Sequence, residues 1–453
     1  MVRIERARIT RIRIRKNFSG LLKGKIVMKL TEMSREQLAA FKEECSKEYE
    51  KYKSMGMKLD MSRGKPGADQ LDIAMPMFDV FTNSASMITE DGIDCRNYGE
   101  LTGISDAKRL FGELLGVGFD EIIIGGNSSL AMMYDTVSRA LSHGVYGSKQ
   151  PWGKYEKIKF LCPAPGYDRH FAICEHFGIE MITVPMNSDG PDMDMVEKLV
   201  AEDETIKGIW CVPLYSNPDG IAYSDEVVRR FANLSPKAED FRIFWDNAYC
   251  VHHLTDTPDR ILNILDECKK TGKENMVFIF ASTSKISFPG AGVAILAGSA
   301  ANMKQISKLM GIQCISYDKI NQLRHVKYFK SVDGIMAHME KHREIIAPKF
   351  RLVLNMLNEQ MEELGILEWN KPNGGYFVAV NTLDGCAKRV VLLCREAGVV
   401  LTGAGATFPY GIDPRDRNIR IAPTYPPLSE LEAAMKIFCV SVKLASAEKL
   451  LDE

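Results

Sequence analysis

The middle of the chain alternates short apolar runs with longer segments of helical periodicity, and this alternation restricts the fold more than any other feature. Parallel strands need such crossover segments, and strands buried on both faces read as nearly continuous apolar runs. Residues from about 86 to 330 are therefore predicted to form an α/β domain, with a mostly parallel central sheet flanked by helices. The strand-like runs lie at residues 121–124, 158–162, 180–184, 209–212, 241–245 and 277–281.

The pattern changes beyond about residue 331. A long helical stretch at 334–364 is expected to be interrupted or bent near Pro348. A strand at 376–380, a helix ending at Gly398 and a strand at 418–422 should follow, and then a last helix that the pair Ser429 and Glu432 is expected to cap. This segment is predicted to be a smaller α+β unit.

Near the N-terminus, Ser34 and Gln37 form a capping box before an amphipathic helix, and a short extended connector follows it. The residues before Ser34 are strongly basic. We therefore expect four parts: a disordered basic extension at 1–32, a helix and connector at 33–65 that join the small domain, a large domain at 66–330, and the small domain at 331–453.

The composition favours a small-molecule partner over nucleic acid or an anionic membrane, because 58 basic residues are balanced by 59 acidic ones. No apolar stretch approaches the roughly 18 to 20 residues of a membrane span. The 11 cysteines lie at irregular spacings without a zinc-ligand pattern, so no metal site is predicted. Scattered thiols are typical of the reducing cytoplasm, where we expect the protein to reside.

Lys285 is placed for nucleophilic chemistry. It ends the segment Ser282-Thr283-Ser284-Lys285, directly after a strand-like apolar run. Burial lowers the pKa of an amine, and the neutral amine is the nucleophile. Asn217, Asp246 and Tyr249 come after earlier strand-like runs. An amine, an amide, a carboxylate and a phenol are the groups that a pyridine ring with a phenolic oxygen needs, so these residues outline a pyridoxal phosphate (PLP) site.

From about residue 33 onward, the chain resembles the fold type I, PLP-dependent class I/II aminotransferases, and most closely an outlying aspartate aminotransferase-like branch. The resemblance implies that Lys285 carries the cofactor and moves a proton at the substrate Cα. It implies that Asp246 keeps the pyridine nitrogen protonated, and that Asn217 and Tyr249 bind the phenolic oxygen.

The same resemblance places Tyr167 on the cofactor ring and His170 behind Asp246, which it would orient. Both belong to the segment Pro165-Gly166-Tyr167-Asp168-Arg169-His170, which follows a strand-like run. A histidine satisfied within the core is the alternative interpretation of His170.

The cofactor phosphate is expected at Gly125-Gly126-Asn127-Ser128-Ser129, which leaves a strand-like run and opens a helix. Backbone amides at such a terminus favour an anion, and Asn127 and Ser128 are predicted to bind it together with Ser282 and Ser284. By resemblance, Tyr98 reaches the phosphate of the neighbouring subunit, which implies a homodimer with shared active sites.

One position departs from the family pattern. Gly292 stands where the family has an arginine that grips the phosphate, so another group must meet that charge.

Arg420 matches the arginine that binds the substrate α-carboxylate, since a guanidinium fork fits a carboxylate bidentately. Arg63 and Gly64 lie on the connector that, by resemblance, runs along the mouth of the site. Arg63 would pair with the distal carboxylate of an acidic substrate or help to neutralise the phosphate; the alternative is a solvated loop charge.

The predicted function is amino transfer between an amino acid, aspartate in first place, and a 2-oxo acid such as 2-oxoglutarate, by a ping-pong mechanism. A PLP-dependent lyase or other Cα chemistry is the alternative, because the same lysine, aspartate and tyrosine serve those reactions. A non-catalytic ligand sensor is the third class. That architecture has a winged-helix domain in front, for which the residues before Ser34 are too few.

Overall fold

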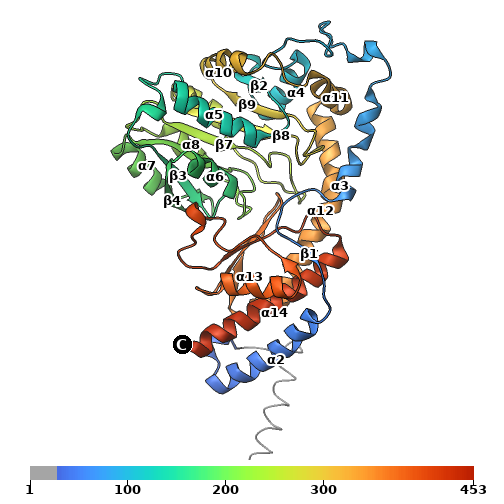
Figure 1. Cartoon of the computed structure of the whole chain (residues 1–453), viewed down its shortest axis with the longest axis vertical. Coiled ribbons are helices and arrows are strands. Elements are labelled where there is room, and N and C mark those ends of the chain that lie inside the picture. Colours follow the sequence, from blue (N-terminus) through green and yellow to red (C-terminus); the bar gives the residue numbers. More distant parts are fainter. Residues whose placement is uncertain (1–27) are drawn as a thin grey trace, which may run out of the picture.

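The computed structural model describes residues 28–453, which form a broad upper part and a narrower lower part connected by the long helix α12 (Val332–Met361) (Figure 1). Residues 1–27 of the expected basic extension lie outside the described residues. The extension was expected to reach residue 32, but Leu30 is fully buried in the turn η1 (Leu30–Glu32). Its apolar side chain packs into the core of the lower part, so this end of the segment is folded.

The upper part contains an eight-stranded sheet with the strand order β2-β9-β8-β7-β6-β3-β4-β5. The run from β8 through β7, β6 and β3 to β4 is parallel, whereas β9 is antiparallel to both of its neighbours. The predicted mostly parallel sheet is confirmed, although β9 was not among the expected strands. The strands are β2 (Ile122–Ile124), β3 (Lys159–Ala164), β4 (Glu180–Asn187), β5 (Gly190–Pro191), β6 (Ile206–Cys211), β7 (Arg242–Asp246), β8 (Val277–Ser282) and β9 (Ala294–Gly298).

Both faces of this sheet are apolar and covered by helices. Alternate residues of a strand point to opposite faces, and accordingly Ile243 and Trp245 pack in one buried cluster while Phe244 packs in another. The first cluster receives side chains from α4 (Ser105–Leu115), α7 (Met193–Glu202), α8 (Asp225–Asn233), α9 (Ile264–Lys270) and α11 (Lys319–Phe329). The second receives them from α5 (Ser129–His143), α6 (Asp168–His176) and α10 (Ala300–Gln313).

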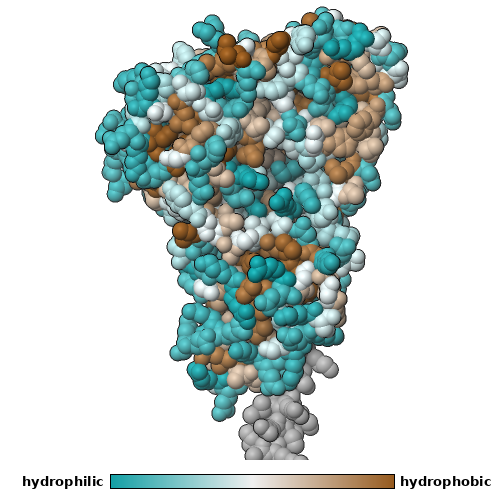
Figure 2. Space-filling view, viewed as in Figure 1, coloured by the Kyte–Doolittle hydropathy of each residue, from teal (hydrophilic) through white to brown (hydrophobic). Residues whose placement is uncertain are grey.

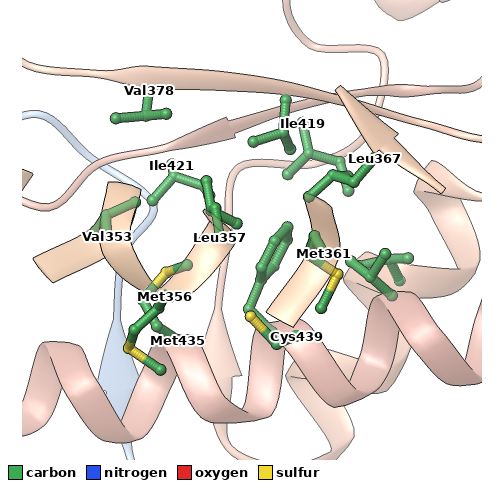
Figure 3. Close-up of a cluster of buried hydrophobic side chains, with 14 of the residues drawn as sticks. Val353, Met356, Leu357, Met361, Leu367, Val378, Ile419, Ile421, Met435 and Cys439 are labelled. Atoms are coloured by element: carbon green, nitrogen blue, oxygen red, sulfur yellow. The ribbon is translucent and has the colours of Figure 1, made fainter. Parts of the chain in front are cut away.

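The lower part is built around a three-stranded antiparallel sheet with the order β10-β11-β13. Figure 3 shows its core, where Leu357 of α12 and Ile421 of β13 lie near Met435 of the last helix. The elements are β10 (Leu367–Trp369), β11 (Val378–Thr382), α13 (Ala387–Glu396), β13 (Asn418–Ile421) and α14 (Leu428–Asp452).

The N-terminal helix α2 (Arg35–Lys53) packs along α14, and Leu38 and Phe41 enter the core of the lower part. The predicted capping box is present, because Ser34 Oγ accepts from Gln37 N–H and Gln37 Oε1 accepts from Ser34 N–H. The connector then pairs with the lower part through β1 (Leu59–Asp60) and β12 (Val399–Val400), and α3 (Ala68–Ile73) leads into the upper part. The remaining turns are η2 (Met75–Val80), η3 (Ser84–Met87), η4 (Phe119–Glu121), η5 (Trp152–Lys154), η6 (Glu274–Met276), η7 (Glu362–Leu364) and η8 (Pro409–Gly411).

The predicted interruption near Pro348 is absent, and the predicted cap of the last helix is wrong. α12 passes through Pro348 as one helix of 30 residues. A proline removes a single backbone hydrogen bond, and the burial of Ile346 and Phe350 on either side holds the helix together. α14 begins at Leu428 behind Pro427, whose extended backbone ends the preceding loop, so Ser429 lies inside the helix and does not cap it.

α12 contributes to both cores. Its first turns place Ile335 and Met339 in the core of the upper part, whereas Ile346 and the residues after it belong to the core of the lower part. We therefore propose that the division between the domains lies inside α12 rather than at residue 331.

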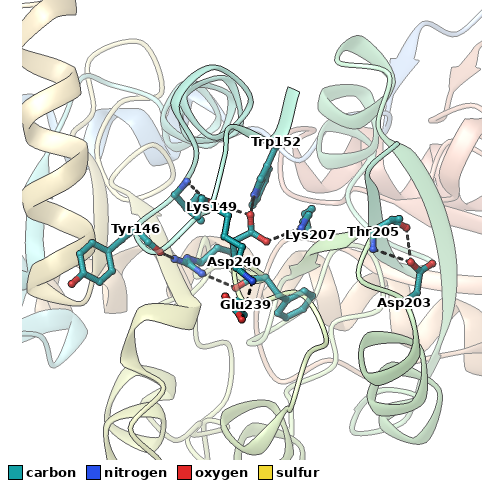
Figure 4. A network of polar contacts seen from close by, with 12 residues as sticks. Tyr146, Lys149, Trp152, Asp203, Thr205, Lys207, Glu239 and Asp240 are labelled. Carbon is teal, nitrogen blue, oxygen red and sulfur yellow. Dashed lines mark hydrogen bonds and ion pairs between the residues drawn. The ribbon is translucent and has the colours of Figure 1, made fainter. Parts of the chain in front are cut away.

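A buried polar network fixes the amino ends of β6 and β7. The Asp240 carboxylate accepts from Lys207 Nζ at 2.7 Å, Trp152 Nε1 at 3.0 Å and Ser148 Oγ at 3.1 Å (Figure 4). Three donors satisfy this buried charge, which would otherwise be strongly destabilising. The opposite, carboxyl ends of these strands lead to the cavity described below.

The outer surface in the view of Figure 2 is mostly hydrophilic, with apolar residues in scattered patches. Across residues 28–453, no helix is both long and apolar enough to cross a lipid bilayer.

Candidate active site

A cavity of about 640 Å³ lies where the carboxyl ends of β6, β7 and β8 face the lower part. The upper part contributes Lys285, Asp246 and Asn217 to its lining, and the lower part contributes Phe377 and Arg420. The connector at residues 62–65 and the start of α6 close its sides. This is the position at which open α/β sheets commonly bind ligands.

Lys285 projects into this cavity three residues after the end of β8. Burial lowers the pKa of its ammonium group, and the nearby Asp246 carboxylate opposes that shift in part. The Nζ atom lies 4.8 Å from the centre of the Tyr249 ring, and Tyr376 Oη donates to the Lys285 carbonyl oxygen at 3.4 Å. The structure thus holds a lysine whose amine is easily deprotonated at the centre of the site.

Asp246 is the last residue of β7 and is 3% exposed. His170 Nε2 lies 3.0 Å from Asp246 Oδ2, and the imidazole stacks on Trp210 with 4.4 Å between ring centres. The other carboxylate oxygen, Oδ1, is buried and has no hydrogen-bond partner among residues 28–453. A buried, unpaired carboxylate oxygen is costly, and a protonated pyridine nitrogen would satisfy it.

Asn217 and Tyr249 stand beside Asp246 on the cavity wall. Arg420 Nη1 donates to Asn217 Oδ1 at 3.0 Å, which leaves the amide nitrogen to donate to a ligand oxygen. Burial raises the pKa of the Tyr249 phenol well above its usual value, so it stays a donor. Tyr167 also lines the cavity, and burial raises the pKa of its phenol to about 12.

The predicted phosphate site lies at the amino end of α5. Ser128 caps this helix by accepting from Ala131 N–H, and the cavity wall continues along the first turn at Ser129. Ser282 Oγ donates to Ser284 Oγ at 3.0 Å, and Ser284 Oγ donates to the Asn127 carbonyl at 3.3 Å. The structure therefore brings the four predicted residues together, with backbone amides of the helix beside them.

Gly292 lies against this group, in a position where a side chain would be crowded. A Cβ atom at Gly292 would lie 3.0 Å from Thr283 Oγ1 and 3.0 Å from the Phe288 carbonyl oxygen. Arg324 lies beside the same loop and donates from Nη2 to the Ala291 carbonyl at 3.3 Å. Arg324 is not part of the cavity lining.

Arg420 enters from β13 in the lower part and is 7% exposed. Its Nη1 atom also donates to Asp168 Oδ1 at 3.1 Å, and its Nη2 atom donates to Thr402 Oγ1 at 3.2 Å. The guanidinium lies 4.8 Å from the centre of the Phe377 ring. Asp168, Thr402 and Phe377 were not predicted, although Asp168 stands in the segment that supplies Tyr167 and His170.

Arg63 and Gly64 both line the cavity, as expected for a connector that runs along the mouth of the site. Arg63 is exposed at the mouth. A Cβ atom at Gly64 would lie 2.4 Å from Phe377 Cζ, so only glycine lets the connector lie directly on that ring. Ser62, one residue before Arg63, accepts from Thr402 Oγ1 through its carbonyl oxygen, which ties the connector to the partners of Arg420.

The predicted residue Tyr98 does not line the cavity of its own chain. It is 78% exposed and lies on the surface of the upper part.

Among residues 28–453, no cluster of His, Cys, Asp and Glu side chains is suited to hold a metal ion. The lysine after β8, the unpaired Asp246 oxygen at the end of β7 and the helix terminus of α5 fit a PLP molecule. Together with the mostly parallel sheet, they define a fold type I PLP-dependent transferase.

The chain belongs to the aspartate amino-transferase family, whose model matches residues 33–453. It is 43% identical over 419 residues to the aspartate aminotransferase of Corynebacterium glutamicum, covering 92% of this chain and 96% of that protein. It is 45% identical over 427 residues to a protein of Mycolicibacterium smegmatis named as an aminotransferase, covering 94% and 100%.

The fold comparison agrees with the family. The crystal structure of an aspartate transaminase from Corynebacterium glutamicum superposes with a TM-score of 0.91 at 42% identity, covering 94% of this chain and 100% of that one. The predicted family and fold class are confirmed, and the chain is a PLP-dependent aminotransferase.

Proposed function

We propose that this aminotransferase exchanges the amino group of an acidic amino acid, aspartate in first place, with 2-oxoglutarate in two half-reactions. The observation that supports acidic substrates is the charge around the cavity. Arg63, Lys65 and Arg169 line it, are exposed, and make no ion pair within residues 28–453. Both carboxylates of the lining, Asp168 and Asp246, already have partners. A second substrate carboxylate is therefore attracted by these three unpaired cations.

We propose that the cavity residues of the upper part bind the cofactor. When bound, PLP supplies an electron sink for the charge that develops at the substrate Cα. Lys285 would carry the cofactor, and its Nζ atom, whose pKa burial lowers, is placed to remove the Cα proton. Asp246 would hold the ring nitrogen protonated through Oδ1, while His170 holds Oδ2.

The remaining residues are assigned to other groups of the cofactor and to the substrate. Asn217 and Tyr249 would bind the phenolic oxygen, and Tyr167 would cover the ring. The phosphate would lie at the amino end of α5, held by residues of that turn and of the lysine loop, namely Asn127, Ser128, Ser282 and Ser284. Arg420 would bind the α-carboxylate of either substrate.

We further propose a homodimer with shared active sites, located in the cytoplasm. Tyr98 lies three residues before Leu101, whose side chain approaches Gly311 of α10. Tyr98 is 78% exposed and Ile312, the residue after Gly311, is 90% exposed, and such large exposed side chains are typical of an interface. The cytoplasmic location is supported by the 11 cysteines, all of which are unpaired.

Mixing two inactive variants tests the shared site. Lys285→Ala and Tyr98→Ala subunits, refolded together, should form mixed dimers with one intact site each and regain activity. No gain in activity after verified subunit exchange would show that Tyr98 serves its own chain or no site.

The substrate proposal is tested with the purified PLP-loaded enzyme and single amino acids. Aspartate and glutamate should discharge the visible absorbance of bound PLP fastest, and pyridoxamine phosphate should accumulate. Faster discharge by alanine or lysine would contradict the acidic preference. Ammonia release without pyridoxamine phosphate would instead favour the lyase alternative.

A further inference from the structure

Asp168 forms an ion pair with the arginine that we assign to the substrate carboxylate, inside the cavity where that substrate would bind. We propose that Asp168 is a resident counter-ion of Arg420, which a substrate carboxylate displaces, so that Asp168 sets the affinity of the enzyme for every carboxylate substrate. This inference rests on the proposed role of Arg420.

Most N–H donors of the Arg420 side chain already have an acceptor within the protein. A guanidinium group has five N–H donors, and Nη1 supplies two of them. Asp168 Oδ1 at 3.1 Å and Asn217 Oδ1 at 3.0 Å use both Nη1 donors, and Thr402 Oγ1 uses one donor of Nη2. The Nε atom is buried and unpartnered among the described residues. A carboxylate that approaches the fork end-on, through Nη1 and Nη2, must therefore replace an acceptor that is already there.

Asp168 is the acceptor that can leave. Asn217 is 4% exposed and is enclosed beside Asp246 and Tyr249, whereas the Asp168 side chain is 35% exposed. Asp168 is also chemically the same group as the ligand, a carboxylate. Exchange of one carboxylate for another leaves Arg420 paired throughout, so the buried guanidinium is never left without a counter-ion.

The released side chain has a second favourable environment. Asp168 is the first residue of α6, where no side chain caps the free N–H groups. A carboxylate in the first turn of a helix is stabilised by these groups and by the helix dipole. Asp168 can therefore turn from Arg420 toward solvent at the start of α6 without becoming an isolated buried charge.

The expected consequence is a common effect on all substrates. The α-carboxylate is present in every amino acid and 2-oxo acid, so a resident competitor weakens the binding of all of them alike. Removal of a partly exposed ion pair should change affinity by about fivefold. If Asp168 instead held Arg420 in position, its loss would weaken binding.

The experiment compares Asp168→Asn with the wild type as PLP-loaded enzymes. The KM values for L-aspartate, L-alanine and 2-oxoglutarate should all fall about fivefold, and calorimetry should show the same fall in the Kd of succinate. Glu175→Gln is the matched control, since it removes one negative charge from an exposed position of the same helix and should leave these values unchanged. Asp168→Ser, which also removes the charge, should behave like Asp168→Asn.

A double-mutant cycle separates this inference from the proposed function. In an Arg420→Ala background, Asp168→Asn should no longer change the Kd of succinate, because the counter-ion has lost its partner. An increase in KM or Kd in the single variant, or an effect that persists without Arg420, would overturn the role of Asp168. Unchanged succinate binding in Arg420→Ala alone would overturn the assignment of Arg420 itself.

Discussion

The two halves of the active site are built in different ways. The cofactor half lies at the ends of adjacent strands of one sheet, with Lys285 after β8, Asp246 at the end of β7 and Asn217 after β6. The substrate half combines Arg63 from the connector and Arg420 from the other sheet, with further residues from α6 and the loop after β12.

This difference separates chemistry from recognition. Lys285, Asp246 and Asn217 follow or end adjacent strands of one sheet, so this sheet sets their relative positions before any substrate arrives. The substrate half joins elements of both parts, and its geometry depends on how closely these parts approach each other. We therefore expect substitutions in the first half to reduce the rate for every substrate, and substitutions in the second half to change KM.

The largest effect is expected from Lys285→Ala. Loss of the amine removes the attachment of the cofactor and the base at the substrate Cα, so kcat should fall by at least about 10⁴-fold. Steady-state assays and circular dichroism would show an inactive but folded protein. As a check on the assignment, borohydride should fix PLP to Lys285 in the wild type, and labelling of another lysine would contradict it.

Asp246→Asn should have the next largest effect on kcat. A neutral amide cannot keep the pyridine nitrogen protonated, so kcat should fall on the order of a hundredfold or more for all substrates, while PLP stays bound. Rate measurements and the absorbance of the bound cofactor test this together. Near-normal turnover would place the electron-sink function on another residue.

Arg420→Lys addresses the substrate half. A point charge cannot reproduce a bidentate fork, and the loss of one charge-assisted hydrogen bond corresponds to a rise in KM of roughly 10- to 100-fold. Aspartate and alanine should be affected equally, because both carry the α-carboxylate. An effect on aspartate alone would mean that Arg420 binds the side chain of the substrate.

Arg63→Ala should have the smallest and most selective effect. Because Arg63 is exposed at the mouth, we expect kcat/KM for aspartate and glutamate to fall about fivefold, with alanine unchanged. Weaker retention of PLP for all substrates, measured by dialysis and absorbance, would indicate instead that Arg63 balances the phosphate. A change below about twofold in both measurements would leave Arg63 as a solvated loop charge.

Much of the cofactor half could be predicted from the sequence, because its residues follow buried apolar runs and the carboxyl ends of parallel strands meet at one edge of a sheet. The pairing of Arg420 with Asp168 could not be predicted, since 252 residues separate the two. No local pattern distinguishes Asp168 from an ordinary first residue of a helix. The role of Gly64 could not be predicted either. A side chain at this position would collide with the ring of Phe377, which is far away in the sequence.

The sequence by itself determined the alternation of strands and helices, the family, and the chemical groups available to hold PLP, because these depend on local periodicity and on residue identity. Only the tertiary structure decided that α12 passes through Pro348 into both cores, that Asp246 keeps one carboxylate oxygen unpaired, and that Arg420 already has a counter-ion. These features arise from packing and from hydrogen-bond donors and acceptors shared between segments far apart in the chain, and such long-range contacts have no local signature.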